Sequence, residues 1–360
     1  MQCEFFADWV IDSGPDFLIR DTTEDLSVRT AFDPRIQKGA EEALASACKG
    51  QIDPESDVQA AIVVQSADGA VRAMIGGRQF RGVEGQFNRA LHAKRQTGFV
   101  FKTFIYAAAL DMGHSPLETI VDESITIQAP GASPWSPRNF TRRFYGKVTL
   151  LDALSRSLNM SVIKLSQEID LESVRAVAEG FGIESDLAAG PALVLGVSEA
   201  SLLEMTAAYA GILNGGSEAA PYGISELLLR GETDPLVTYQ SGIQERVISK
   251  SAAAQLIYLL HTAIESGTGK RARISGLQTA GKTGATWSNR DAWFVGFSAD
   301  YVVGVWMGHD DNRPLRGVAG GGRVSGLLCM TDPVHASPKG SMNDHLERSP
   351  GRTAEGRRAP

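Results

Sequence analysis

The stretch AGKTGATWSNRDAWFVGFSADYVVGVWM, residues 280–307, decides the fold. Residues 291–297 and 301–307 within it are rich in valine, phenylalanine and tryptophan, and a short polar turn separates them. Two runs of this kind around a turn predict an antiparallel β-hairpin. The triplet Lys-Thr-Gly at 282–284 is best interpreted as part of a strand that leads into this hairpin.

A second hairpin is expected early in the chain. Residues 60–65 and 71–75 are rich in β-forming residues and flank Asp68-Gly69, a dipeptide typical of tight turns. Residues 101–264 are mainly helical in pattern. The order of strands, a long helical block and strands again predicts one α+β domain in which early and late strands share a sheet.

A helix is expected in front of the first hairpin. Asp33 is a typical N-cap, Pro34 suits the first helical position, and the Lys-Gly pair at 49–50 is a typical stop. Residues 214–242 are interrupted by glycine and proline, so we expect loop with short pieces of strand there.

The composition excludes several classes of protein. The chain has 360 residues, 43% of them hydrophobic and 21% charged, which is ordinary for a globular protein. Its net charge of −7 gives no general basic field, so we expect no nucleic-acid partner. Cys3, Cys48 and Cys329 are far apart and predict neither a disulfide framework nor a zinc site. We expect no metal and no cofactor.

No membrane or export signal is visible in the sequence. No run approaches the ~18 apolar residues that a membrane span needs. Residues 1–9 lack the basic stretch and apolar core of a signal peptide. Taken alone, the sequence predicts a cytoplasmic location if the chain is expressed as written.

One motif belongs to nucleotide hydrolases. Gly276, Gly281, Lys282 and Thr283 match the phosphate-binding loop, G-x-x-x-x-G-K-T. That loop requires a buried strand before it and a helix after it, so that backbone amides converge on the phosphates. The flanking residues have neither pattern. We interpret the match as coincidence and keep a P-loop nucleotide hydrolase as the alternative from a different class.

The run His309-Asp310-Asp311 contains three residue types that bind metals. Three adjacent residues cannot converge on one ion without further ligands, and none can be named. We therefore predict a structural loop.

Three short motifs support a different interpretation. They are a Lys-Thr-Gly triplet, a Ser-x-Asn triplet and a lysine that opens a helix, at 282–284, 157–159 and Lys102. Together they resemble the three-element signature of penicillin-interacting serine enzymes, which is Ser-x-x-Lys, Ser-x-Asn and Lys-Thr-Gly. Further matching segments are Gly76-Gly77, 86–90, Arg95-Gln96, 153–159, 207–210, 267–270 and 291–296. Over about residues 30–322 the chain is similar to the transpeptidase domain of class A penicillin-binding proteins.

The resemblance implies a fold and a domain division. The fold is α+β, of the penicillin-binding protein and β-lactamase type: a five-stranded antiparallel sheet covered by helices, plus an all-helical subdomain. Residues 1–55 would be a linker region and leading helix, 56–325 the transpeptidase domain, and 326–360 a disordered, atypical tail. The glycosyltransferase half and membrane anchor of class A proteins are not found in the sequence. Family members act in the periplasm at the inner membrane, which is the location that the resemblance implies.

The resemblance also implies a chemistry. In this family the serine of Ser-x-x-Lys attacks the D-Ala-D-Ala bond of a peptidoglycan stem peptide, and an amine of another stem peptide resolves the acyl-enzyme. β-Lactams acylate the same serine. The residues carried over are Lys102 as the base, Ser157 as the proton relay, Asn159 as the contact to the substrate amide, Lys282, Thr283 and Gly284 as the carboxylate-binding strand, and Ala285 as an oxyanion-hole amide.

The nucleophile is the exception. Three residues before Lys102 stands Phe99, which has no nucleophilic atom. Thr97 lies on the wrong side of the helix start to replace the serine, and Ser157 would be displaced from the oxyanion amides. We therefore expect a transpeptidase-like protein of cell-wall synthesis that lacks catalysis. It would be a remnant, or at most a binder of stem peptides, β-lactams or partners of wall synthesis without a covalent bond.

Overall fold

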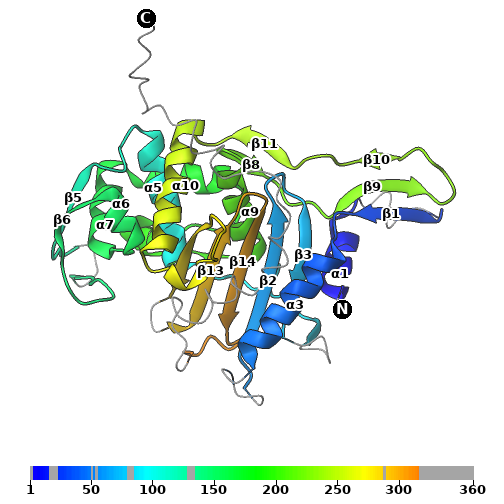
Figure 1. The fold of residues 1–360 in the computed structure, drawn as a ribbon, viewed down its shortest axis with the longest axis horizontal. Coiled ribbons are helices and arrows are strands. Elements are labelled where there is room, and N and C mark those ends of the chain that lie inside the picture. The colour runs from blue at the N-terminus through cyan, green and yellow to red at the C-terminus, as the bar shows by residue number, and fades with distance from the viewer. Residues whose placement is uncertain are drawn as a thin grey trace, which may run out of the picture.

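The computed structural model describes residues 3–15, 23–49, 52, 56–78, 85–127, 134–286 and 289–315. At its centre lies a five-stranded antiparallel sheet with the order β12-β13-β14-β2-β3 (Figure 1). The strands are β2 (Gln59–Ser66), β3 (Val71–Ile75), β12 (Ala280–Ala285), β13 (Asp291–Phe297) and β14 (Tyr301–Gly308). β14 lies beside β2, with Tyr301 opposite Ser66 and Gly308 opposite Gln59. Both predicted hairpins and the shared sheet are confirmed.

Helices cover both faces of this sheet. They are α3 (Pro34–Cys48), α9 (Leu202–Leu213) and α10 (Lys250–Glu265). Ile62 and Val64 of β2 pack in the same cluster as α3, while Ala61 and Val63 belong to the larger core that includes α9 and α10. Asp33 caps α3, as its sequence predicts. The alternation of β2 side chains between two apolar layers explains why the strand is buried on both faces.

A mainly helical subdomain lies beside the β12 edge of the sheet (Figure 1). Its elements are α5 (Lys102–Asp111), α6 (Leu150–Ser155), α7 (Asn159–Glu168), α8 (Leu171–Gly180) and a short hairpin of β5 (Thr119–Asp122) and β6 (Gly146–Thr149). Nine of the ten residues of α5 are buried, so α5 is the central helix of the group.

The helical pattern expected over 150–165 is interrupted in the structure. α6 ends at Ser155 and α7 begins at Asn159. Between them Ser157 has a φ of +57°, a left-handed conformation that is incompatible with a continuous helix. The apolar periodicity continues through the break, which is why the sequence alone predicts no interruption.

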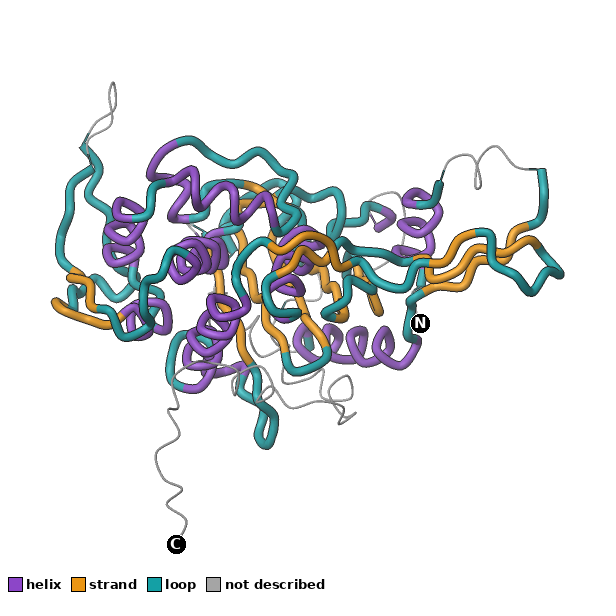
Figure 2. Tube along the Cα trace, turned by 90° about the horizontal axis from the view of Figure 1, so that it is seen from above, coloured by secondary structure: helices purple, strands orange, loops and turns teal. Residues whose placement is uncertain are grey.

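A long ribbon projects from the body at the opposite side (Figures 1 and 2). It consists of β1 (Leu26–Thr30), β9 (Ile224–Leu229) and β10 (Val237–Thr238), and beside it β8 (Ser217–Ala219) pairs with β11 (Ile243–Arg246). These short strands confirm the expectation for 214–242. The remaining elements are α1 (Glu4–Ser13), β4 (Arg95–Gln96), β7 (Glu199–Ala200), η1 (Gly98–Phe101), η2 (Gly190–Leu195) and η3 (Lys270–Ala272).

Several expectations fall at the ends of the chain. The tail predicted for 326–360 and Cys329 lie outside the described residues. Cys3 and Cys48 are free thiols. In the part of the chain that the structure describes, none of the helices has both the length and the apolar character to cross a bilayer.

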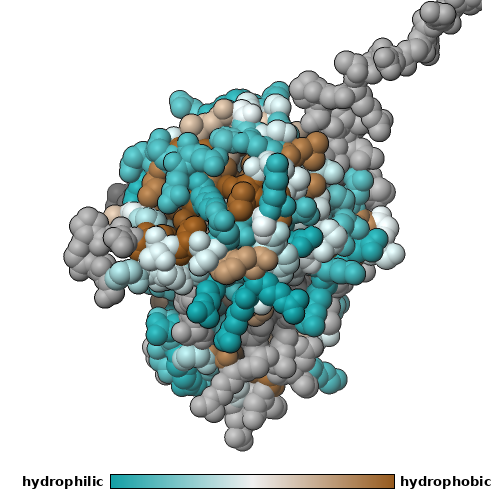
Figure 3. All heavy atoms as spheres, turned by 90° about the vertical axis from the view of Figure 1, so that its left-hand side faces the viewer, coloured by the Kyte–Doolittle hydropathy of each residue, from teal (hydrophilic) through white to brown (hydrophobic). Residues whose placement is uncertain are grey.

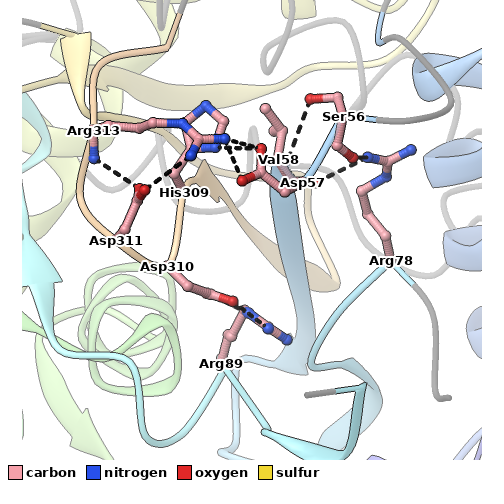
Figure 4. A network of polar contacts seen from close by, with 9 residues as sticks. All are labelled: Ser56, Asp57, Val58, Arg78, Arg89, His309, Asp310, Asp311 and Arg313. Atoms are coloured by element: carbon pink, nitrogen blue, oxygen red, sulfur yellow. Dashed lines mark hydrogen bonds and ion pairs between the residues drawn. The ribbon is translucent and has the colours of Figure 1, made fainter. Parts of the chain in front are cut away.

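A cluster of ion pairs joins the end of β14 to the start of β2 and to the segment before η1 (Figure 4). Arg89, 2% exposed, donates from Nε and Nη2 to the two carboxylate oxygens of Asp310 at 2.8 and 2.6 Å. Arg313 pairs with Asp57 and Asp311. We call Asp57, Arg89, Asp310, Asp311 and Arg313 the ion-pair clamp. It fixes the segment that leads into η1 against the sheet.

Candidate active site

Three elements bring two lysines and a serine together. Lys102 begins α5, Lys282 lies in β12, and Ser157 lies in the break between α6 and α7. Lys282 Nζ lies 3.0 Å from Ser157 Oγ, and Lys102 Nζ lies 3.4 Å from the same oxygen. Both lysines are fully buried. The structure therefore assembles three of the predicted site residues from positions more than 50 residues apart in the sequence.

The amide and hydroxyl groups of the other predicted residues line the same place. Asn159 accepts a hydrogen bond from Lys102 Nζ on Oδ1 at 2.7 Å and donates from Nδ2 to the Arg138 carbonyl at 2.6 Å. Thr283 donates from its hydroxyl to that of Thr268 at 3.1 Å. These contacts fix the orientation of both side chains.

Burial changes the protonation chemistry of the lysine pair. It lowers the pKa of Lys282 from its ordinary value of 10.5 to about 7. Burial also lowers the pKa of Lys102 well below its usual range, the charge of Lys282 lowers it further, and Asp122 opposes the shift in part. A lysine with a lowered pKa can accept a proton from a neighbouring hydroxyl near neutral pH. The cluster therefore has the chemistry of a general base beside Ser157.

The break between α6 and α7 positions Ser157. Lys102 Nζ donates to the Ser157 carbonyl at 2.7 Å and to the Leu158 carbonyl at 3.3 Å. The backbone amides of both residues remain bonded to carbonyls of α6, from Leu154 and Ala153 respectively. Because the left-handed turn satisfies these groups, the helix can stop here and present the serine hydroxyl to both lysines.

Phe99 lies at the start of this cluster. It is half-buried in η1, one helical turn before Lys102, and its ring centroid is 4.4 Å from Lys102 Nζ. The predicted oxyanion-hole residue, Ala285, is close by, since a Cβ placed on Gly98 would lie 2.6 Å from the Ala285 carbonyl oxygen. An aromatic ring therefore lies directly beside Lys102.

Close packing of η1 on β12 explains two of the glycines. Gly98 has a φ of +54°, and a Cβ on it would lie 2.9 Å from the carbonyl carbon of Ala285. A Cβ on Gly284 would lie 2.9 Å from Val100 Cγ1 and 3.1 Å from the Val100 amide nitrogen. A larger residue at either position would separate η1 from the strand, and Phe99 would move away from Ala285.

Two adjoining cavities open onto this cluster, with volumes of about 540 and 420 Å³. Together they form what we call the cleft. Residues that line both cavities are Phe99, Asn139, Phe140, Ala285 and Asn289. Figure 3, which faces the side of the molecule that carries α6 and α7, shows apolar side chains exposed between hydrophilic ones. The volume suits a small ligand or a short peptide.

Residues missed by the sequence analysis are the arginines of the cleft. Arg138 and Arg142 line the larger cavity, and Arg156 and Arg271 line the smaller one. No aspartate or glutamate lines either cavity in the part of the chain that the structure describes. A sequence signal was available, because residues 124–151 contain four cationic residues and no acidic one.

Other hydroxyls near the base are already engaged. Thr97 donates from Oγ1 to the Ser198 carbonyl at 3.1 Å. The hydroxyl of Thr103 lies 2.6 Å from that of Tyr209, and Tyr209 donates to the Val100 carbonyl at 3.0 Å. The judgement that Thr97 cannot replace the missing serine agrees with this geometry.

The nucleotide-hydrolase alternative does not fit the structure. Gly276 lies in a turn with a φ of +81°, while Lys282 and Thr283 lie in the middle of a strand. The next described element after β12 is β13, not a helix. Without a helix N-terminus behind the loop, backbone amides cannot converge on a phosphate. The motif match is a coincidence, as its context predicts.

Possible metal ligands gather away from the cleft. His114, Glu118 and Glu168 bring their ligand atoms within 4.8 Å of one another at the surface, and Glu118 already accepts hydrogen bonds from His114 and the Ser115 amide. His309 Nδ1 lies 3.1 Å from Asp57 without hydrogen-bond geometry. Neither group adjoins Lys102 or Ser157, so neither contributes to the site.

Comparison with known proteins agrees with this architecture. Residues 59–325 match the family model of the penicillin binding protein transpeptidase domain. Penicillin-binding protein 1A of Neisseria meningitidis is 34% identical over 278 residues, 74% of this chain and 34% of that protein. Penicillin-binding protein 1B of Vibrio cholerae is 32% identical over 309 residues, 83% of this chain and 39% of that protein. The chain thus spans about a third of the length of the curated relatives it matches.

Solved structures show the same fold. Penicillin-binding protein 1A from Haemophilus influenzae superposes with a TM-score of 0.72 at 30% identity, over 79% of this chain and 48% of that one. PonA1 from Mycobacterium tuberculosis superposes with a TM-score of 0.81 at 25% identity, over 94% and 92%. The expected α+β fold is confirmed. The chain belongs to the penicillin-binding protein transpeptidase domain family, whose domains serve peptidoglycan synthesis.

Proposed function

We propose that this chain is a non-acylating transpeptidase domain, which binds the D-Ala-D-Ala end of peptidoglycan stem peptides, and β-lactams, without a covalent bond. The domain would work outside the inner membrane, where stem peptides are cross-linked. The observation that carries the proposal is Phe99, whose ring lies 4.4 Å from Lys102 Nζ at the position that the family motif gives to the serine.

The rest of the cleft supports recognition. Lys282 and Thr283 would hold the terminal carboxylate, and Asn159 would contact the peptide amide. Support for the β-lactam part comes from a relative, since PonA1 from Mycobacterium tuberculosis has been solved in complex with penicillin V; it superposes with a TM-score of 0.77 at 27% identity, over 89% of this chain and 88% of that one.

The missing step can be stated in atoms. Acylation by a β-lactam requires a hydroxyl oxygen that bonds to the lactam carbonyl carbon while the ring C–N bond breaks and its nitrogen takes the hydroxyl proton. Phe99 offers neither the oxygen nor the proton. Loss of a serine nucleophile lowers turnover on the order of 10⁶-fold in serine hydrolases. The lysine base would remain, with no nucleophile in front of it.

Intact-protein mass after incubation with benzylpenicillin tests the proposal. The parent should keep its mass, whereas Phe99→Ser should gain the full mass of the drug, because ring opening releases no fragment. Phe99→Ala is the matched control, since it opens the same space without supplying a nucleophile, and it should keep its mass.

Two results would contradict the proposal. A mass gain on the parent would show that another residue is acylated, with Ser157 the first to examine. Failure of the parent and Phe99→Ala to bind D-Ala-D-Ala peptides or penicillin reversibly, in protein with native circular dichroism, would exclude the binding function.

A further inference from the structure

Two arginines of the cleft differ from the paired arginines elsewhere in the described part of the chain. Arg138 and Arg142 lie on the loop before β6 and border the larger cavity. Among the described residues no carboxylate forms an ion pair with either guanidinium. Elsewhere in the chain, arginines such as Arg89 and Arg313 pair with aspartates. Arg138 and Arg142 therefore carry charge that no described carboxylate neutralises in an ion pair.

The charge extends to both walls of the cleft. Residues 124–151 contain four cationic residues and no acidic one, and residues 266–290 contain five and none. The whole chain has more acidic than basic residues, 42 against 35. The positive net charge of these two segments is therefore opposite to that of the chain. Low-dielectric walls concentrate the field of such charges on whatever enters between them.

Apolar surface accompanies the charge. Phe140 is 78% exposed and lines both cavities, and Phe99 lies between them. A ligand that matches this surface has an apolar body of small side chains and several negative groups. Arginine pairs well with carboxylates because its planar donors match the two oxygens.

From this we infer that the cleft selects D-Ala-D-Ala peptides that carry further free carboxylates on their side chains, over the same peptides with those carboxylates amidated. The inference rests on the proposed function and narrows its ligand class. Lys282 and Thr283 would hold the terminal carboxylate, which both kinds of peptide possess. Arg138 and Arg142 would hold the side-chain carboxylates, which only one kind possesses.

A pair of synthetic peptides tests the inference. Both end in D-Ala-D-Ala; one carries two free side-chain carboxylates and the other carries the corresponding amides. The acidic peptide should bind the full chain about two- to thirtyfold more tightly at low salt, since each of the two exposed ion pairs contributes ~0.2–1 kcal/mol. The preference should shrink at 0.5 M salt because screening shortens the range of exposed charges.

Matched variants locate the effect. The double substitution Arg138→Gln and Arg142→Gln should remove most of the preference, because it should lower the affinity for the acidic peptide much more than the affinity for the amidated peptide. Arg143→Gln removes the same charge as the single substitution Arg142→Gln, from the same exposed loop, at a residue that lines neither cavity. It should keep the preference, whereas Arg142→Gln alone should lower it.

The outcomes separate the two proposals. Equal affinity for both peptides would overturn the selection by side-chain carboxylates and leave the proposed function standing. Binding of neither peptide by natively folded protein would overturn both. If Arg143→Gln lost the preference for the acidic peptide as fully as the cleft variants, the preference would come from the general positive charge of the loop. That result would also overturn the inference.

Discussion

The lysine pair beside Ser157 and the ion-pair clamp both contain buried cations, and their hydrogen-bond partners are of opposite kinds. In the clamp, Arg89 is 2% exposed and both its Nε and Nη2 donate to Asp310. In the lysine pair, Lys102 and Lys282 are fully buried and their hydrogen bonds go to neutral oxygens of Ser157, Leu158, Asn159 and Thr283. Asp122, which acts on the pKa of Lys102, is hydrogen-bonded to Asn139 instead.

The different partners indicate different roles for the two clusters. A buried charge that is paired within the protein holds segments together, and the clamp joins parts of the chain 221 residues apart. A buried charge without a carboxylate partner costs stability, and a fold retains it where a ligand or a reaction uses it. The clamp should therefore stabilise the fold, whereas the lysine pair should destabilise it.

Breaking the clamp should have the largest effect on stability. Asp310→Ala removes the carboxylate that accepts hydrogen bonds from Nε and Nη2 of the buried Arg89. We expect the free energy of unfolding in urea to fall by about 3 kcal/mol, as for other buried charges that lose a partner. The control is Asp311→Ala at an exposed pair, which should change it little. Similar losses for both would contradict a special role for Arg89.

Removing a buried lysine beside Ser157 should raise the free energy of unfolding, whereas breaking the clamp lowers it. Lys282 has a folded pKa of about 7 against 10.5 when unfolded, so the unfolded chain binds more protons between these values. Its presence then penalises folding fully below pH 7, and the penalty disappears as the pH rises towards 10.5. Lys282→Met should be more stable than the parent at pH 7, and this advantage should shrink by about 2 kcal/mol between pH 7 and 9.

Urea unfolding at the two pH values measures this, and Lys270→Met provides the control. Lys270 is an exposed lysine in η3, at the edge of the same region. Lys270→Met should therefore show the same change in the free energy of unfolding between pH 7 and 9 as the parent. An advantage of Lys282→Met that stays constant from pH 7 to 9 would contradict the buried-charge explanation.

The sheet could be predicted from the sequence because its signals are local. The hairpins at 60–75 and 291–307 have strand-forming runs around short turns, and the cap of α3 lies at Asp33. The clamp could not be predicted, since Arg89 and Asp310 carry no pattern that relates them across 221 residues. No single arginine of the cleft can be recognised in the sequence. Only the absence of acidic residues around Arg138 and Arg142 indicates a basic segment there.

The residues of the candidate site could be predicted from a sequence motif. The backbone geometry that brings them together could not. The sequence placed residues 157–159 inside a helical stretch, and the structure breaks the helix there. The conformation of Ser157 depends on contacts with Lys102 and Lys282, which arrive from other elements. Helical periodicity in the sequence depends on the apolar side chains of α6 and α7. It does not depend on residues such as Lys102 and Lys282, which contact Ser157 from other elements.

The smallest predicted effect isolates that conformation. Alanine and glycine at position 157 both remove the hydroxyl, so they differ only in how well they tolerate a φ of +57°. Glycine adopts this conformation without steric cost, whereas an L residue with a Cβ is strained by about 1 kcal/mol. We expect Ser157→Gly to unfold at higher urea concentration than Ser157→Ala.

Ser161 gives the contrasting pair, because it is buried inside α7 with ordinary helical backbone. There glycine should be about 1 kcal/mol less stable than alanine. The same order at both positions would show that Ser157 is not strained. Opposite orders would mean that the fold keeps an unfavourable backbone conformation beside two costly buried lysines, and that combination is expected where a site is held ready for a ligand.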